Sequence, residues 1–99
     1  MLNIYKKEDG NTLSVSLEGR LDTTTAPQLD EELNALLPGK TEVVLDMEKL
    51  EYISSAGLRV LLSAQKIMNK QGEMVIKNAS EEVKEIFDVT GFSDILTVE

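Results

Sequence analysis

The chain has 99 residues, 41% of them hydrophobic, which suits one compact domain over residues 1–99 and argues against a disordered segment. Ten basic and eighteen acidic residues give a net charge of −8, which disfavours nucleic acid and anionic membranes as partners because clustered Lys and Arg bind both. The chain lacks cysteine, which excludes disulfides and thiolate chemistry, and it lacks histidine, the commonest metal ligand and physiological base, so no metal or cofactor is expected.

The first half of the chain predicts a hairpin followed by a helix. Residues 12–18 alternate strictly between apolar and polar side chains, as a strand with one solvated face does, and residues 2–6 are its expected partner. Residues 19–25 are expected to form a loop, and Pro27 suits the first turn of a helix. That helix ends at the Pro-Gly pair 38–39, and leucines at helical spacing form its buried stripe: Leu29, Leu33, Leu36 and Leu37.

The second half alternates strands with helices. Short apolar runs at 43–45 and 74–76 predict strands covered on both faces. Ser80 is expected to cap a third helix that Gly91 ends, and residues 94–98 are candidates for a last short strand. Between the two apolar runs, residues 55–70 predict a second helix with this buried side: Val60, Leu61, Ala64, Ile67 and Met68.

The resulting order is strand, strand, helix, strand, helix, strand, helix, strand. It predicts an α/β fold: one domain with a mixed, mostly parallel sheet of about five strands and three to four helices. In such sheets, functional loops gather at the carboxyl ends of the parallel strands. Residues 46–55 and 77–80 are expected to leave the sheet at that end.

Two serines, Ser54 and Ser55, stand where a strand-like run gives way to the second helix. A hydroxyl at this place faces free backbone N–H groups and the positive end of the helix dipole. Each serine therefore suits either a helix cap or a site that carries a phosphate. Gly57, in the first turn, suits either close packing on the sheet or the approach of a partner to bare backbone.

The residues do not form a recognisable catalytic site. Neither serine has a histidine to activate it, and no G-x-S-x-G elbow is present. Gly57 and Gly72 belong to no phosphate-loop pattern. Asp22 and Asp46 suit turns and caps as well as they suit a carboxylate pair, and no spacing singles out a magnesium site. We therefore expect that the chain is not an enzyme.

Four motifs in order resemble the STAS domain, the family of bacterial anti-sigma-factor antagonists. They lie at residues 19–26, at 45–46 with 50–58, at 72–76 and at 86–91. The resemblance implies a STAS fold and regulation by partner switching. In that mechanism the unmodified antagonist binds an anti-sigma factor that is also a serine protein kinase, and the sigma factor is released. Phosphorylation of the antagonist at the start of its second helix blocks binding, and a PP2C-type phosphatase reverses it.

The resemblance also implies which residues act. Alignment on the Gly57-Leu58 pair places the family's phosphoserine on Ser55. Family members often carry aspartate where this chain has Ser54, so Ser54 is the alternative acceptor, and loss of the switch is a further alternative. The implied partner surface is the start of the second helix with the neighbouring loop: Asp22, Thr23, Thr24, Ser54, Ser55, Ala56, Gly57, Leu58 and Arg59.

Other interpretations stay open. Leu58 suits core packing as well as it suits partner contact, and Arg59 suits a pair with Asp22 or with a partner's carboxylate. The same fold also serves in other signalling complexes or in transporter-associated complexes, and an enzyme or nucleotide hydrolase is a third class. A cytoplasmic location is expected, and the acidic surface favours a monomer.

Overall fold

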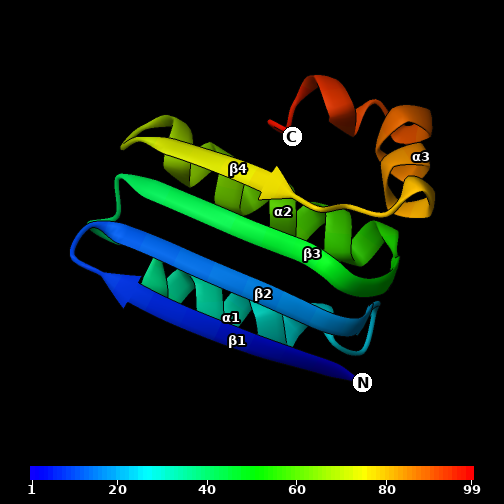
Figure 1. Cartoon of the computed structure of the whole chain (residues 1–99), viewed down its shortest axis with the longest axis horizontal. Helices are drawn as coiled ribbons and strands as arrows, with labels where there is room; N and C mark the ends of the chain where they lie inside the picture. Colours follow the sequence, from blue (N-terminus) through cyan, green and yellow to red (C-terminus); the bar gives the residue numbers. More distant parts are fainter.

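The computed structural model describes residues 1–99 and shows a four-stranded sheet with two helices packed against one of its faces (Figure 1). The strands, in spatial order, are β1 (Leu2–Asp9), β2 (Thr12–Leu21), β3 (Glu42–Ile53) and β4 (Glu73–Lys77). The helices are α1 (Ala26–Leu36), α2 (Ser55–Asn69) and α3 (Glu81–Thr90), followed by the short 3-10 turn η1 (Phe92–Asp94). β1 is antiparallel to β2 and the other neighbours are parallel, which confirms the mixed, mostly parallel α/β fold.

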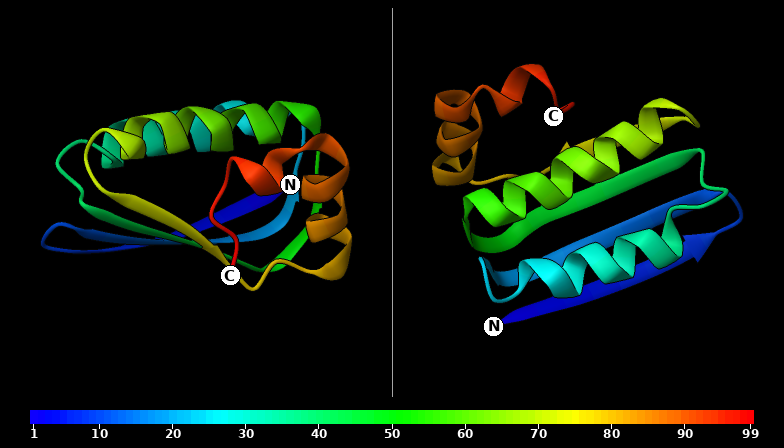
Figure 2. Two further views of the ribbon diagram at one scale, coloured as in Figure 1. Left: turned by 90° about the horizontal axis from the view of Figure 1, so that it is seen from above. Right: turned by 180° about the vertical axis from the view of Figure 1, so that it is seen from behind.

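Both crossover helices, α1 and α2, lie on the same face of the sheet (Figure 2). The reason is the strand order: β2, β3 and β4 follow one another in a single direction, and right-handed crossovers then place their helices on one side. The opposite face carries no helix. The prediction that residues 43–45 and 74–76 are covered on both faces is therefore wrong, and Val44 and Val75 are only half-buried.

One continuous core of 25 buried residues fills the space between the sheet and the helices. Leu13, Val15 and Leu17 alternate into it from β2, as the sequence pattern predicts. On α2 the predicted stripe is buried except for Ile67, which packs against the core while partly exposed. Phe87 from α3 is the largest fully buried side chain. None of these helices is both long enough and apolar enough to cross a membrane.

The two strands that lead to the candidate site are longer than predicted. β2 continues through Leu21, so residues 19–21, which were expected to begin a loop, are part of the strand. β3 runs unbroken to Ile53, so residues 46–53, which were expected to leave the sheet, remain in it. The pairing of β2 with β3 shifts register twice, between Ser16 and Glu18 and between Gly19 and Arg20. Such irregularities displace side chains from strict alternation, which hides the strand in the sequence.

The ends of the chain lie at opposite edges of the sheet (Figure 1). The expected fifth strand is reduced to one isolated parallel bridge between Ile76 and Val98, so the C-terminal residues follow the outer edge of β4. At the other edge, the Arg20 amide donates to the Met1 carbonyl at 3.0 Å. This bond holds the first residue at the carboxyl end of β2.

Candidate functional site

The carboxyl ends of β2 and β3 bring the turn after β2 next to the start of α2. The Ser54 amide donates to the Leu21 carbonyl at 2.9 Å, which joins the residue before α2 to the last residue of β2. The turn at residues 22–25 follows Leu21 directly. The structure thus brings together the Asp22 turn and the serine pair, two segments that are some thirty residues apart in the sequence.

The two serines have different environments. Ser54 is the N-cap of α2: it is half-buried and extended, and its Oγ accepts from the Gly57 amide at 3.4 Å. Ser55 is the first residue of the helix and is exposed, and its hydroxyl makes no hydrogen bond within the protein. Ser54 therefore caps the helix, whereas the Ser55 hydroxyl is free to react.

The start of α2 also has no negative charge of its own. α3 carries Glu81 and Glu82 in its first turn, where they complement the helix dipole, but the first turn of α2 holds no acidic residue. A negative group added at Ser55 would consequently meet a positive helix end that no acidic residue of α2 itself neutralises.

The Asp22 carboxylate organises the neighbouring turn. Its Oδ1 accepts from the Thr24 hydroxyl at 2.8 Å, from the Thr24 amide at 3.0 Å and from the Thr25 amide at 3.2 Å. These bonds, led by that from the Thr24 hydroxyl, lower the pKa of Asp22 below its ordinary value of 3.8. Thr25, which the sequence did not single out, is buried and donates to the Arg20 carbonyl at 2.8 Å. Asp22 is therefore a fixed negative charge beside the start of α2.

Neutralising Asp22 is expected to remove part of the acid sensitivity of the fold. Because the pKa of Asp22 is lower in the folded than in the unfolded chain, its stabilisation is present above the unfolded value and is lost as pH falls through the folded value. Asp22→Asn should thus have a lower melting temperature than the wild type at neutral pH. On acidification from roughly pH 6 to pH 2, the melting temperature of the variant should fall less than that of the wild type. Thermal unfolding followed by circular dichroism measures both curves. Parallel curves for the variant and the wild type would contradict the assignment.

Two residues of the expected partner surface, Gly57 and Leu58, are buried beneath that surface. A Cβ at Gly57 would lie 2.7 Å from Leu21 Cγ and 3.0 Å from Ile53 Cγ1, so close packing accounts for this glycine. Leu58 is 4% exposed and sits in the core. The expectation that Gly57 and Leu58 contact a partner is corrected, because both are buried from the surface.

Arg20 holds the place beside Asp22 that the sequence suggested for Arg59. The Arg20 Nε lies 3.9 Å from Asp22 Oδ2, and its guanidinium carbon lies 4.4 Å from the centre of the Tyr52 ring. Arg59 is exposed and takes part in none of the ion pairs. No sequence pattern indicates the contact between Arg20 and Tyr52, since only the pairing of β2 with β3 makes them neighbours.

Asp46 is not part of this site. It pairs with Ser16, well before the end of β2, and its Oδ1 accepts from the Glu48 amide at 3.0 Å and from Asn78 Nδ2 at 3.3 Å. Asp22 and Asp46 thus do not form the carboxylate pair that the sequence left open. No group of three or more acidic side chains is arranged to hold a metal ion.

Comparisons of the sequence with known proteins indicate the same family, and comparison of the structure agrees with it. The sequence matches the STAS domain family over residues 3–99. It is 44% identical over 94 residues to BtrV of Bordetella bronchiseptica, a candidate anti-sigma factor antagonist, covering 93% of this chain and 80% of that protein. It is 31% identical over 98 residues to the anti-sigma-B factor antagonist of Bacillus subtilis, covering 98% and 90%. An anti-sigma factor antagonist from Mycobacterium paratuberculosis has the same fold, with a TM-score of 0.89 at 19% identity over 99% and 85% of the two chains.

Proposed function

This chain belongs to the STAS domain family of anti-sigma factor antagonists, whose members are regulators and not enzymes, and we propose that it works by partner switching. In this proposal the unmodified protein binds an anti-sigma factor that is also a serine protein kinase, and the sigma factor is released. The kinase then phosphorylates Ser55, which ends the binding. A PP2C-type phosphatase removes the phosphate and restores the binding-competent form.

The contrast between the two serines carries the proposal. Ser55 presents a free, exposed hydroxyl at the N-terminus of α2, whose first turn holds no acidic residue, whereas Ser54 is used as a cap. A phosphate adds a charge of about −1.5 to −2, which gains roughly 0.3–2 kcal/mol at a helix N-terminus. A domain that is stable by about 5–15 kcal/mol therefore keeps its fold when Ser55 is modified.

The proposed docking surface lies around this hydroxyl. Asp22 contributes a fixed negative charge, and Arg20 is already engaged with Asp22 and Tyr52. A phosphate on Ser55 would have to be desolvated in the complex beside Asp22, which costs several kcal/mol unless a cation pairs with it. Arg59, four residues farther along α2, is exposed and in no ion pair, and pairing with the phosphate would withdraw it from the partner. The surface itself consists of these exposed or half-buried residues: Asp22, Thr23, Thr24, Ser54, Ser55, Ala56 and Arg59.

Phosphate mapping tests the assignment of the acceptor. Incubation with ATP and the cognate kinase, followed by mass spectrometry, is expected to place one phosphate on Ser55. Ser55→Ala should take up none, and Ser54→Ala, the matched change at the neighbouring hydroxyl, should still be modified. Phosphate on Ser54 alone would reassign the acceptor. A protein that carries phosphate on neither serine would overturn the switch and favour a role in another signalling or transporter-associated complex.

A further inference from the structure

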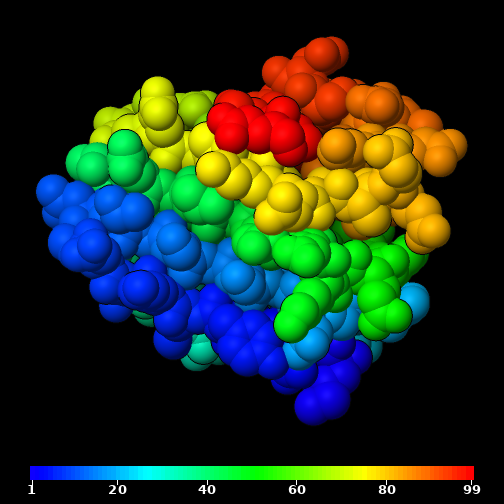
Figure 3. All heavy atoms as spheres, in the orientation of Figure 1, coloured from blue at the N-terminus to red at the C-terminus, as the bar shows by residue number.

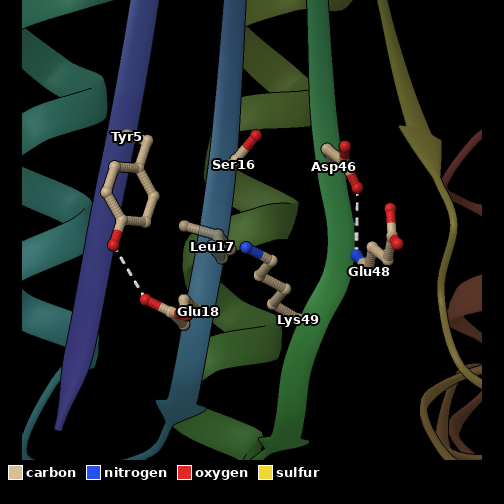
Figure 4. A pocket seen from close by; sticks show the side chains of 7 residues that line it. All are labelled: Tyr5, Ser16, Leu17, Glu18, Asp46, Glu48 and Lys49. Atoms are coloured by element: carbon tan, nitrogen blue, oxygen red, sulfur yellow. Dashed lines mark hydrogen bonds between the residues drawn. The ribbon is translucent and has the colours of Figure 1, made fainter.

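The face of the sheet opposite α1 and α2 contains a groove that the proposed switch does not use. Figure 3 views this face, on which the strands lie side by side without a covering helix. The groove has a volume of about 490 Å³ and is open to solvent. Its lining comes from β1, β2 and β3 (Figure 4): Tyr5, Ser16, Leu17, Glu18, Asp46, Glu48 and Lys49.

Two carboxylates in this groove are held in fixed positions. Glu18 Oε1 accepts from the Tyr5 hydroxyl at 2.8 Å and from Asn3 Nδ2 at 3.2 Å, and these bonds lower the pKa of Glu18. Asp46 Oδ1 is held by the Glu48 amide and by Asn78 Nδ2. In each carboxylate the second oxygen makes no hydrogen bond within the protein, so it remains available to a ligand.

Tyr5 adds an aromatic platform beside these carboxylates. Its side chain is 54% exposed, and Figure 4 shows the ring face-on, with its face turned outward from the sheet. The bond to Glu18 fixes the direction of the ring. A guanidinium is the cation that matches this arrangement, because it stacks on an aromatic face while its N–H groups donate to carboxylate oxygens.

Elsewhere in the chain, an arginine occupies the same combination of an aromatic ring and a carboxylate. At the end of β2, the Arg20 guanidinium lies over the Tyr52 ring and beside the Asp22 carboxylate. In the groove, an aromatic ring and carboxylates are present, but the arginine is missing. Lys49 is the one base in the lining, against three carboxylates, and it forms no ion pair with any of them.

We propose that this groove binds an arginine side chain from a basic segment of a second protein partner. The guanidinium stacks on Tyr5 and pairs with the free oxygen of Glu18, while Asp46, which lies two strands away from Tyr5, adds negative potential to the groove and the flexible Lys49 ammonium moves aside. The groove lies on the middle of the open sheet face, and Ser55 lies at the carboxyl end of the strands on the helix side. Both surfaces can therefore be occupied at once.

Nuclear magnetic resonance with a defined peptide tests the proposal. The probe is the blocked pentapeptide Gly-Arg-Gly-Arg-Gly, titrated into the isotope-labelled full chain, with Gly-Lys-Gly-Lys-Gly and Gly-Glu-Gly-Glu-Gly as comparisons. Saturable shifts are expected at the amides of Tyr5, Ser16, Glu18 and Asp46. The arginine peptide should bind about threefold or more tightly than the lysine peptide, because a guanidinium stacks on an aromatic face while its N–H groups donate to a carboxylate, which the compact ammonium does less well. Shifts spread evenly over the acidic surface would overturn the proposal.

Charge variants separate a built site from general attraction. Glu18→Gln combined with Asp46→Asn is expected to weaken binding of the arginine peptide about tenfold, while the matched pair Glu31→Gln with Glu85→Gln, exposed on the helices, changes it less than about twofold. Equal weakening by the two pairs would mean that net charge alone attracts the peptide, and the proposal would fail.

Lys49→Gln is expected to change the affinity for the arginine peptide in the opposite direction. Removal of the competing ammonium is expected to tighten binding of the arginine peptide about two- to fivefold, an effect that partial unfolding cannot imitate. Unchanged or weaker binding would contradict the placement of the guanidinium beside Lys49. Ser55→Ala should leave peptide binding unaltered, so failure here is distinguishable from failure of the phosphorylation switch.

Discussion

Ser55→Glu is expected to weaken binding of the anti-sigma factor at least about 100-fold, which corresponds to about 2.8 kcal/mol. The added carboxylate would be buried in the complex beside Asp22, whose low pKa keeps it ionised. A charge that is desolvated in an interface beside a like charge is strongly destabilising, and pairing with the exposed Arg59 on the same helix would withdraw that cation from the partner. Ser55→Ala should keep the wild-type affinity, because Ser54 and not Ser55 caps α2.

Ser63→Glu is the matched control for this measurement. Ser63 is exposed on the same helix, two turns farther on, so the variant carries the same added charge on the same element. Isothermal titration calorimetry with the purified anti-sigma factor should show less than about a twofold change for Ser63→Glu. Thermal unfolding should show that Ser55→Glu is at least as stable as the wild type, since its charge favours the helix dipole. Equal affinities for Ser55→Ala and Ser55→Glu would refute the proposal that negative charge at Ser55 blocks binding.

Phe87→Ala is expected to lower the free energy of unfolding by about 3–5 kcal/mol. Phe87 is 1% exposed and anchors α3, a helix of ten residues whose only other buried side chain is Val83. Removal of the ring leaves a cavity and deprives α3 of most of its attachment to the core. Urea denaturation followed by circular dichroism measures the change.

Val89→Ala provides the comparison on the same helix. Val89 is 79% exposed, so its truncation should change the free energy of unfolding by less than about 0.5 kcal/mol. A similar cost for both variants would point to helix propensity rather than to packing as the cause. A small cost for Phe87→Ala would mean that α3 is not docked as the structure shows.

Features that depend on neighbouring residues were predictable from the sequence. Ser80 caps α3, with its Oγ accepting from the Val83 amide at 3.2 Å, and Gly91 ends the helix with a φ of 81°. Both assignments follow from short-range chemistry: an oxygen that satisfies a free amide, and a left-handed residue that glycine tolerates. The alternation of β2 likewise identified its buried face without knowledge of its neighbours.

Features that depend on distant pairing were not predictable. The buried side chains of the last part of β3 are Met47, Leu50 and Ile53, spaced by three instead of two because of the register shifts against β2. A period of three does not indicate a strand, so the sequence does not predict that β3 continues past residue 45. Val44 and Val75 looked fully covered because their runs are apolar, whereas cover depends on the side from which the crossover helices approach.

The candidate site divides in the same way. The serines and Asp22 were identified through motifs that resemble a family, and the structure brings them together. The contact of Arg20 with Tyr52 and the groove on the open face escaped prediction, since both form only when separate strands align. The groove residues Tyr5, Glu18 and Lys49 look in sequence like ordinary solvent-facing positions of amphipathic strands.

The anchored first residue has a practical consequence for binding assays. Because the Arg20 amide holds the Met1 carbonyl, an affinity tag or dye fused ahead of residue 1 would emerge two residues from Asp22, against the proposed docking surface. Such a fusion would obstruct docking sterically, with the same loss of binding that we propose for phosphorylation. A label placed after Glu99 would instead leave beside β4, so immobilisation through the C-terminus is the safer geometry.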